Sequence, residues 1–506
     1  MTWLAWFLSF CTGFISLSEE ILWVRIISFA FESTPRAFAL VLTAFLGGIA
    51  LGALFGKRLS ERQQATPATA VYLLLLAGGL LLALPTIIAA VGQHDFATFW
   101  MLLLILLGAA LKGTLFPIVH HLGSKQGDSL GRSVSRTYFF NILGSTLGPL
   151  VTGLFLLDNF SSGNSLQILG VLCLLSAFAP LLFILRTGEK RASVVGLVLG
   201  LAGLLAFPLL QPVGATLMQT LATGSGHVRV LIENRHGIVH SVVDGDKDDT
   251  VYGGNVYDGK TNIDLVSNSN MIDRAYLLYG LHPAPKRILV IGLSSGAWTR
   301  IIGSIPGVEK IDVVEINPGY VEMIRSYPHL SPLLDDPRLS LHIDDGRRWL
   351  RRSHEKFDLV VMNTTFHWRA NITNLLSTEM MNLVHDALAP DGIFAFNTTS
   401  SFDAFYTATE TFPHAYLFRN FVYAAKHDFR EQQPELVARL KSFQLNGQPL
   451  FPETPENELA LNKLGASKFI GIEKITEIFP RPLQVVTDQN MITEFRFGRW
   501  AKSSGN

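Results

Sequence analysis

The chain has 506 residues, of which 48% are hydrophobic and 16% charged, with 41 basic and 41 acidic side chains. This length is sufficient for two or more domains. The balanced charge, without a basic run or an acidic tail, argues against a nucleic-acid partner. Both cysteines, Cys11 and Cys173, precede residue 212, which excludes a disulfide framework or a thiolate zinc site in the later part of the chain.

Apolar residues dominate the chain up to about residue 212, whereas the remainder has the composition of a soluble domain. A helix needs about 20 apolar residues to cross the hydrocarbon core of a bilayer. Seven stretches meet this condition: 3–30, 37–56, 69–92, 97–120, 136–157, 165–185 and 192–211. We therefore predict a polytopic α-helical domain over residues 1–212, in the lipid bilayer of the cell (inner) membrane.

Basic residues gather in alternate loops of this domain. They are Lys57, Arg58 and Arg62 in the first such loop, Lys125, Arg132 and Arg136 in the next, and Arg186, Lys190 and Arg191 in the last. The positive-inside rule makes these loops cytoplasmic. The final span would then carry the soluble part of the chain to the outer side of the membrane.

Two features inside the spans allow more than one interpretation. Gly48, Gly52 and Gly56 recur every four residues, which favours close helix packing, with a flexible transport pathway as the alternative. Five polar residues are costly in lipid and should face the bundle interior or the interface: Glu19, Glu20, Arg25, Lys112 and Asn141. They predict either a cation or polyamine path or an Arg25–glutamate pair that neutralises itself.

After a predicted linker at 213–226, a small β subdomain is expected over residues 227–270. It begins with two short β-type runs, joined by a turn at Asn234–Gly237. The following segment, DDTVYGGNVYDGKTNIDL, is predicted to be a loop that lines a site, or alternatively a structured turn rich in Gly and Asn. Its candidate substrate-binding residues are Tyr252, Tyr257 and Asp258.

The stretch Arg287–Glu315 has the layout of a nucleotide site. Its apolar run Ile288–Ile291 predicts a strand buried on both faces. Gly292 and Gly296 then bracket a tight turn before a helix, and a second strand ends on Glu315. Glycines let the backbone approach a ligand, and the carboxylate accepts ribose hydroxyls. A βαβ unit whose glycines serve only the turn is the alternative.

Strands continue to alternate with helices, at 338–343, 357–362 and 393–396. This alternation predicts a parallel, doubly wound, Rossmann-like α/β domain over residues 271–506, with ligands at the carboxyl ends of the strands. Polar side chains follow those ends: Ser294, Ser295, Glu315, Asp345, Asn363 and Asn397.

Over roughly residues 227–420, these motifs resemble the spermidine synthase (polyamine aminopropyltransferase) family in its membrane-fused form. VIGLSSG at 290–296 lies where that family carries a GGGDG loop, VVEINP at 313–318 matches its ribose-binding strand, and IDDG at 343–346 matches its adenine-binding motif. The resemblance implies a small β-domain before a Rossmann-like fold shared with class I methyltransferases. It also implies decarboxylated S-adenosylmethionine or S-adenosylmethionine as co-substrate, no metal, and these cofactor-binding residues: Gly292, Ser294, Ser295, Gly296, Glu315, Asp345 and Gly346.

The acidic residues of that family are missing at two places. Ser295 stands where the family has a loop aspartate, and its D-x-x-D-P motif aligns with residues 363–367, NTTFH. Asn363 and His367 are the candidate catalytic residues. Aminopropyl transfer needs a base, and Asn363 can accept a hydrogen bond but cannot act as that base. His367 is a candidate substitute, with a structural histidine as the alternative. Arg369 is basic where a polyamine pocket should be acidic, which favours an anionic or neutral acceptor, or no acceptor at all.

The leading prediction is a membrane-anchored protein that binds an S-adenosyl-type nucleoside and transfers an aminopropyl group to a polyamine or related acceptor. The first alternative is a methyltransferase-type enzyme that uses intact S-adenosylmethionine. The second is a non-catalytic nucleoside or polyamine sensor or transporter. A homo-oligomer is left open.

Overall fold

The computed structural model describes residues 2–92, 96–123, 130–187, 190–224, 226–245, 248–363, 365–445 and 447–496. Lys125 and the side chains of Lys190 and Arg191, named above for their charge, lie outside the described residues. The chain divides into two compact units. One comprises residues 1–31, 36–222 and 233–235, and the other 32–35, 223–232 and 236–506.

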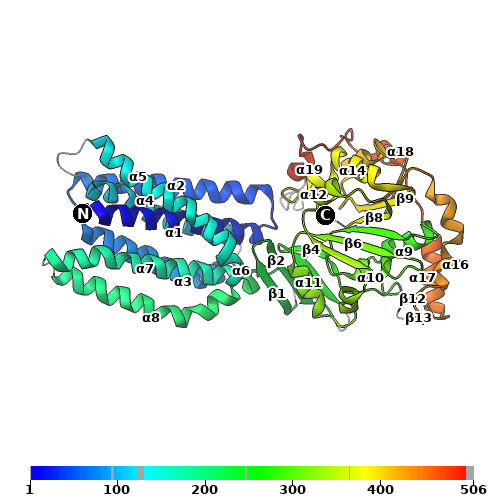
Figure 1. The fold of residues 1–506 in the computed structure, drawn as a ribbon, viewed down its shortest axis with the longest axis horizontal. Helices are drawn as coiled ribbons and strands as arrows, with labels where there is room; N and C mark the ends of the chain where they lie inside the picture. Colours follow the sequence, from blue (N-terminus) through cyan, green and yellow to red (C-terminus); the bar gives the residue numbers. More distant parts are fainter. Residues whose placement is uncertain are drawn as a thin grey trace. The chain divides into compact units, whose positions relative to one another are not determined.

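The first unit is helical (Figure 1). Its helices are α1 (Thr2–Ala30), α2 (Pro35–Glu61), α3 (Pro67–Val91), α4 (Ala97–Gly123), α5 (Leu130–Val151), α6 (Leu157–Asn159), α7 (Ser162–Thr187) and α8 (Lys190–Leu221). A π-helical turn, Thr152–Leu156, joins α5 to α6. In the described ranges, seven helical segments are long and apolar enough to cross a membrane, which agrees with the predicted number.

The glycines of α2 lie against the backbone of α4. A Cβ atom added to Gly48, Gly52 or Gly56 would overlap carbonyl oxygens of α4. Small residues at this spacing therefore let the two helix backbones approach closely. The packing interpretation of the glycine repeat accounts for all three positions.

A buried ion pair lies inside the helical unit, but its partners differ from those expected. Glu19 pairs with Lys112 of α4 and also accepts a hydrogen bond from Trp23 Nε1 at 3.0 Å. Arg25 instead donates from Nε to Ser162 Oγ at 2.9 Å. Sequence spacing favoured a pair within one helix, whereas helix packing supplies Glu19 with a partner from another.

The predicted linker at 213–226 is helical over most of its length, because α8 continues to Leu221. Pro208 and Pro212 lie inside this helix. Proline is typical of a helix end in soluble proteins but is tolerated within long apolar helices, where neighbouring groups satisfy the freed carbonyls. The prediction of a linker from these residues was therefore wrong before residue 222.

The second unit begins with a four-stranded sheet in the order β1-β2-β3-β4. Its strands are β1 (Val228–Asn234), β2 (Gly237–Val243), β3 (Asp249–Gly253) and β4 (Val256–Lys260). The last two form a hairpin within the segment that was predicted to be a loop, with a Gly-Asn turn as in the structured-turn alternative. Gly254 and Asn255 form its tip with φ of +57° and +68°. Both residue types tolerate this left-handed conformation, which a two-residue hairpin turn requires.

The main sheet has seven strands in the order β10-β11-β9-β8-β5-β6-β7. They are β5 (Arg287–Ile291), β6 (Lys310–Glu315), β7 (Leu339–Ile343), β8 (Phe357–Met362), β9 (Leu388–Asn397), β10 (His414–Phe418) and β11 (Phe421–Ala425). The strands from β5 to β9 pair in parallel, and β11 pairs antiparallel with β9 and β10. This sheet confirms the predicted Rossmann-like fold. The β10–β11 hairpin was not predicted, since its turn places Arg419 rather than glycine at positive φ.

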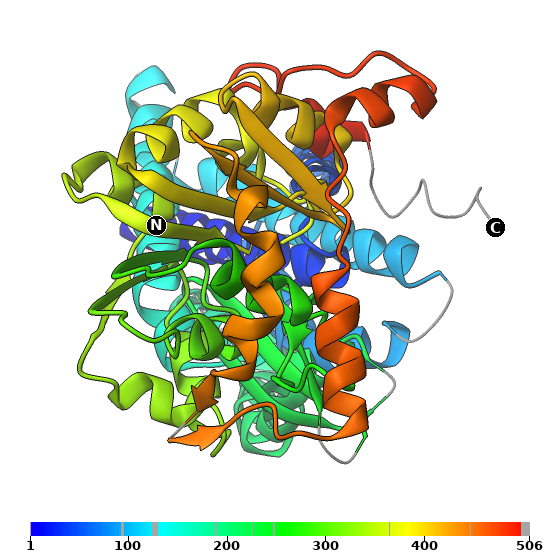
Figure 2. The ribbon, with the colours of Figure 1, turned by 90° about the vertical axis from the view of Figure 1, so that its right-hand side faces the viewer.

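Helices cover both faces of this sheet, because alternate strand residues point to opposite sides. α12 (Gly346–Arg352) and α14 (Thr378–Ala387) lie on one side in Figure 1, and α10 (Ala297–Ile302) and α11 (Gly319–Arg325) on the other. α16 (Leu436–Lys441) and α17 (Pro455–Gly465), orange in Figure 2, lie side by side. The remaining elements are α9 (Asp273–Leu281), α13 (Thr373–Leu376), α15 (Phe402–Thr409), α18 (Ile472–Ile478), α19 (Ile492–Arg496), the 3₁₀ turns Ser331–Asp335 and Phe429–Glu435, and the short pair β12 (Gln444–Leu445) and β13 (Gln448–Pro449).

Candidate active site

Two cavities open at the carboxyl ends of the parallel strands in the second unit. Cavity A has a volume of about 450 Å³, and its walls include Gly292, Ser294, Glu315, Tyr320, Asp345 and Arg369. Cavity B has a volume of about 430 Å³, and its walls include Tyr257, Asn270, Arg274, Asn397, Thr399 and Asn420. Asp258, Asn363 and Thr365 line both cavities. The two cavities therefore adjoin at these three residues.

The structure brings most of the residues singled out from the sequence to these walls. Cavity A receives Gly292, Ser294, Glu315, Asp345 and Gly346, cavity B receives Tyr257, and Asp258 and Asn363 face both. Four others do not line either cavity: Tyr252, Ser295, Gly296 and His367. Tyr252 instead stacks on His240 with ring centroids 4.8 Å apart.

Glu315 ends β6 and holds the turn that follows β5. Its Oε2 accepts a hydrogen bond from the backbone N–H of Leu293 at 2.7 Å, and its Oε1 accepts one from Asn317 at 2.8 Å. Burial raises the pKa of Glu315 to about 7, although both backbone donors favour the charged form. The carboxylate is thus fixed at the wall of cavity A, where a ligand hydroxyl can reach its remaining lone pairs.

Glycine is required at two points around cavity A. Gly292 has φ of +89°, and a Cβ added to Gly346 would overlap the side chain of Ile291. Gly292 therefore allows the left-handed turn after β5, and Gly346 lets the start of α12 pack against Ile291. Ser295, by contrast, donates its hydroxyl to the carbonyl of Lys260 at 2.8 Å, and so ties the turn to β4.

Asp258 lies at the junction of the two cavities. It is the carboxylate that lines both of them, where the family's aspartates are missing. Tyr320 donates its hydroxyl to Asp258 Oδ2 at 2.6 Å, and Ser294 donates to the Asp258 carbonyl. Burial raises the pKa of Asp258 to about 6, against the opposing effects of Tyr320 and the charge of Arg369. A carboxyl group with this pKa can accept a proton near neutral pH.

A chain of amides lines cavity B. Asn397 donates from Nδ2 to Asn363 Oδ1 at 3.2 Å, and its Oδ1 accepts from Asn420 Nδ2 at 2.9 Å. Asn420 in turn accepts from Arg274 Nη1 at 2.7 Å. Sequence reasoning placed Asn363 and Asn397 at strand ends but missed Asn420 and Arg274. These two come from the unpredicted hairpin and from α9, and no motif marks either residue.

His367 supports the wall of cavity B without lining it. Its backbone N–H donates to Thr399 Oγ1 at 2.8 Å, and its Nδ1 lies 3.0 Å from the Thr399 carbonyl. Burial lowers the pKa of His367 to about 4. Thr399 and Ser400 have φ of +50° and +72°, a costly backbone for such residues. His367 therefore holds a strained wall segment and does not face the cavities as a base.

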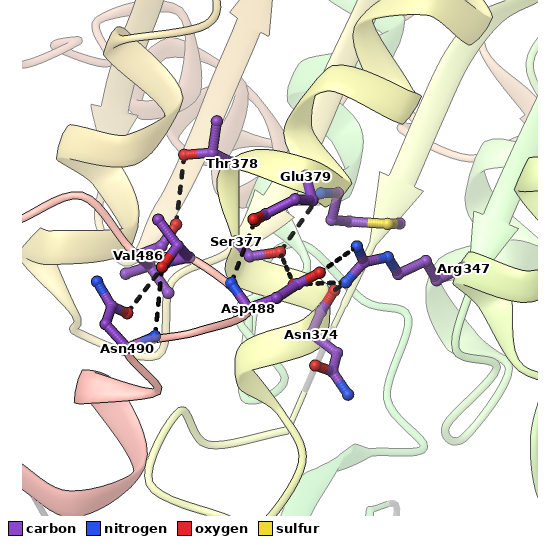
Figure 3. A network of polar contacts seen from close by, with 10 residues as sticks. Arg347, Asn374, Ser377, Thr378, Glu379, Val486, Asp488 and Asn490 are labelled. Carbon is purple, nitrogen blue, oxygen red and sulfur yellow. Dashed lines mark hydrogen bonds and ion pairs between the residues drawn. The ribbon is translucent and has the colours of Figure 1, made fainter.

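The C-terminal segment holds another part of the wall (Figure 3). Asp488 forms a bidentate ion pair with Arg347 of α12 at 2.6 and 2.5 Å and accepts from Ser377 Oγ at 2.7 Å. Arg347 also donates to the carbonyl of Asn374, which lines cavity A, at 3.2 Å. Residues near the C-terminus thus fix the position of one side of cavity A.

Among the described residues, one group has donor atoms close enough to hold a metal ion: His282, Asp358 and Asp391. Asp358 Oδ2 already accepts the backbone N–H groups of Lys286 and Arg287, at 2.7 and 2.8 Å. This group lies at the opposite ends of β5 and β8 from the cavities, because Asp358 is the second residue of β8. It therefore has no part in the site at the carboxyl ends.

Comparisons with known proteins point to one family. Residues 274–411 match the profile described as the spermine/spermidine synthase domain. The polyamine aminopropyltransferase 1 of Streptomyces coelicolor is 24% identical over 385 residues, which cover 72% of this chain and 70% of that protein. The polyamine aminopropyltransferase of Agathobacter rectalis is 36% identical over 123 residues, 24% of this chain and 43% of that protein.

A crystal structure of a spermidine synthase in complex with the transition-state analogue AdoDATO aligns with a TM-score of 0.37 and 18% identity. The alignment covers 55% of this chain and 87% of the spermidine synthase chain. The profile match spans α9 to α15 and includes the turn at Gly292, Glu315, Asp345 and Asn363. The chain therefore carries a spermidine synthase-like domain that includes residues 274–411.

Proposed function

We propose that this protein is a membrane-anchored transferase that holds an S-adenosyl-type nucleoside in cavity A and an amine acceptor in cavity B. The observation that carries the proposal is the meeting of the two cavities at Asp258, Asn363 and Thr365. A transfer between two substrates needs such a junction, because the reacting atoms must approach within about 3–3.5 Å. Glu315 and Asp345 would hold the nucleoside, as the family resemblance implies.

The chemistry would be nucleophilic attack by the acceptor amine on the aminopropyl carbon beside the sulfonium. The new N–C bond forms as the C–S bond breaks, and the sulfur keeps the electron pair as a neutral thioether. The amine then loses a proton to a base. Asp258 fits this role better than His367, because it lies at the junction with a raised pKa.

Calorimetry on the purified full-length protein tests the nucleoside site. We expect decarboxylated S-adenosylmethionine to bind, and Glu315→Gln to weaken that binding by about tenfold or more, because a charged acceptor is lost. The matched control Glu322→Gln changes an exposed glutamate of α11 and should leave affinity unchanged.

Unchanged affinity in Glu315→Gln would contradict the assignment of cavity A. If intact S-adenosylmethionine binds and the decarboxylated form does not, methyl transfer replaces aminopropyl transfer as the proposed reaction. Binding without a product, detected by mass spectrometry across polyamine and other amine acceptors, would favour the sensor instead.

A further inference from the structure

Arg274 is a buried cation on the wall of cavity B. Only 6% of the residue is exposed. Its guanidinium carbon lies 5.1 Å from the ring centroid of Trp298 and 4.8 Å from that of Phe421. Two aromatic rings therefore hold the guanidinium group in place beside the cavity.

Neutral groups accept all the hydrogen bonds of this guanidinium that the structure shows. They are the carbonyl of Met271 at 2.9 Å, Asn420 Oδ1 at 2.7 Å and the carbonyl of Asn270 at 3.3 Å. Within the described part of the chain, no carboxylate forms an ion pair with Arg274. The neighbouring Asp273 pairs with Arg419 instead, at 2.8 Å. Buried charges in proteins are normally paired, so a carboxylate of a ligand in cavity B would supply the counter-charge of Arg274.

The remaining charges of cavity B do not suit a polycation. Its wall contains one carboxylate, Asp258, and two guanidinium groups, Arg274 and Arg419, while the other polar wall groups are amides and hydroxyls. A linear polyamine would bring two or more positive charges to this wall. One of its ends would then lie beside a buried guanidinium, at a cost that grows in a low-dielectric site.

We infer that the acceptor is an amine that also carries a carboxylate, such as an ω-amino acid, with the carboxylate on Arg274 and the amine at Asp258. This inference rests on the proposed transfer. The hydrogen-bonded amides Asn420 and Asn397 connect Arg274 with Asn363, which lines the junction of the cavities together with Asp258. The reaction joins the amine nitrogen to the aminopropyl carbon, releases 5′-methylthioadenosine and passes one proton to Asp258.

Two acceptors of matched length test this inference on the full-length protein with decarboxylated S-adenosylmethionine. They are 4-aminobutanoate and 1,4-diaminobutane, which differ in the charge of one end. We expect kcat/KM for 4-aminobutanoate to be at least about tenfold higher, because only its carboxylate can pair with Arg274. The product, detected by mass spectrometry, is N-(3-aminopropyl)-4-aminobutanoate.

The variant Arg274→Gln should remove this preference, chiefly through a higher KM for 4-aminobutanoate. The measured quantity is the ratio of the two kcat/KM values, which a general loss of folding would not reverse. Arg430→Gln serves as the matched control, since Arg430 pairs with Asp428 on the surface at 2.6 Å and should keep the ratio unchanged.

Equal or better turnover of 1,4-diaminobutane by the unaltered protein overturns the inference and leaves the proposed function standing. The inference is also overturned, with the proposed function still standing, if the protein binds 5′-methylthioadenosine but neither binds nor converts 4-aminobutanoate. Failure of the protein to bind any of the nucleosides overturns the proposed function itself.

Discussion

At the scale of single residues, the proposed base Asp258 lies at the site where the expected motif has lost its carboxylates. Asn363 occupies the end of β8, and an amide cannot take a proton near neutral pH. Asp258 reaches the same place from β4, and its burial raises its pKa to about 6. The carboxylate is thus displaced along the chain but retained at the junction of the cavities.

Replacement of this carboxylate tests its role. Asp258→Asn should lower kcat by about a hundredfold to ten-thousandfold, the usual contribution of a general base, while nucleoside binding persists. In the unaltered protein, kcat/KM should fall by about tenfold for each pH unit below about 6, because a protonated carboxyl group cannot accept the amine proton. Above that pH Asp258 is ionised, so any further change in rate reports on Glu315, whose pKa is about 7, or on the acceptor amine.

The control for this variant is Asp386→Asn, since the Asp386 side chain is 84% exposed and lies away from both cavities. A full rate in Asp258→Asn, or a profile without an acid limb, would show that another group takes the proton.

At the scale of elements, the wall of cavity A depends on a segment far along the chain. Asp488 binds Arg347 at the start of α12, and Thr373 donates its backbone N–H to Glu494 at 3.1 Å. Ile372, Asn374 and Leu375, next to Thr373 in the chain, line the cavity. The C-terminal segment therefore acts as a brace for segment 365–376, which includes α13 and supplies several wall residues.

Removal of the Asp488 charge should loosen this brace. Asp488→Asn leaves the largely buried Arg347 without its bidentate partner, so we expect a loss of about 1–3 kcal/mol in unfolding free energy and weaker nucleoside binding. Thermal unfolding and calorimetry in detergent measure both effects. Asp428→Asn, which breaks the exposed pair with Arg430, should cost less than about 1 kcal/mol and leave binding intact. Equal behaviour of the two variants would rule out a brace.

At the scale of the whole molecule, a long apolar helical unit accompanies the spermidine synthase-like domain. The alignment with the Streptomyces protein covers 72% of this chain, more than the part that follows Ala222, so it necessarily includes some of the helical unit. Several helices also expose large apolar side chains, among them Leu205 and Leu209 of α8 at 75% and 80%. Exposed apolar surface of this extent is typical of lipid contact.

We therefore expect the protein to remain with membranes after an alkaline carbonate wash and to need detergent for extraction. An alkaline phosphatase reporter fused after Asn506 should be active, because the basic loops place the final span with its end outside. Fluorescence of a reporter that matures only in the cytosol would reverse this orientation. Release of the protein by the wash would contradict the membrane anchor.

The sequence by itself determined the fold class and much of cavity A. Unbroken apolar runs such as Ile288–Ile291 indicate strands that are buried on both faces. The turn at Gly292 and the carboxylate of Glu315 belong to one βαβ unit, in which Glu315 accepts a hydrogen bond from Leu293. Only the tertiary structure decided the character of cavity B. One of its charges comes from Arg274, whose amide partner Asn420 lies 146 residues away in the chain. Sequence reasoning assigned the basic character of the acceptor site to Arg369, which lines cavity A. The burial of a side chain and the absence of a charged partner depend on which segments pack around it. Neither property can be read from the sequence when those segments are far apart in the chain.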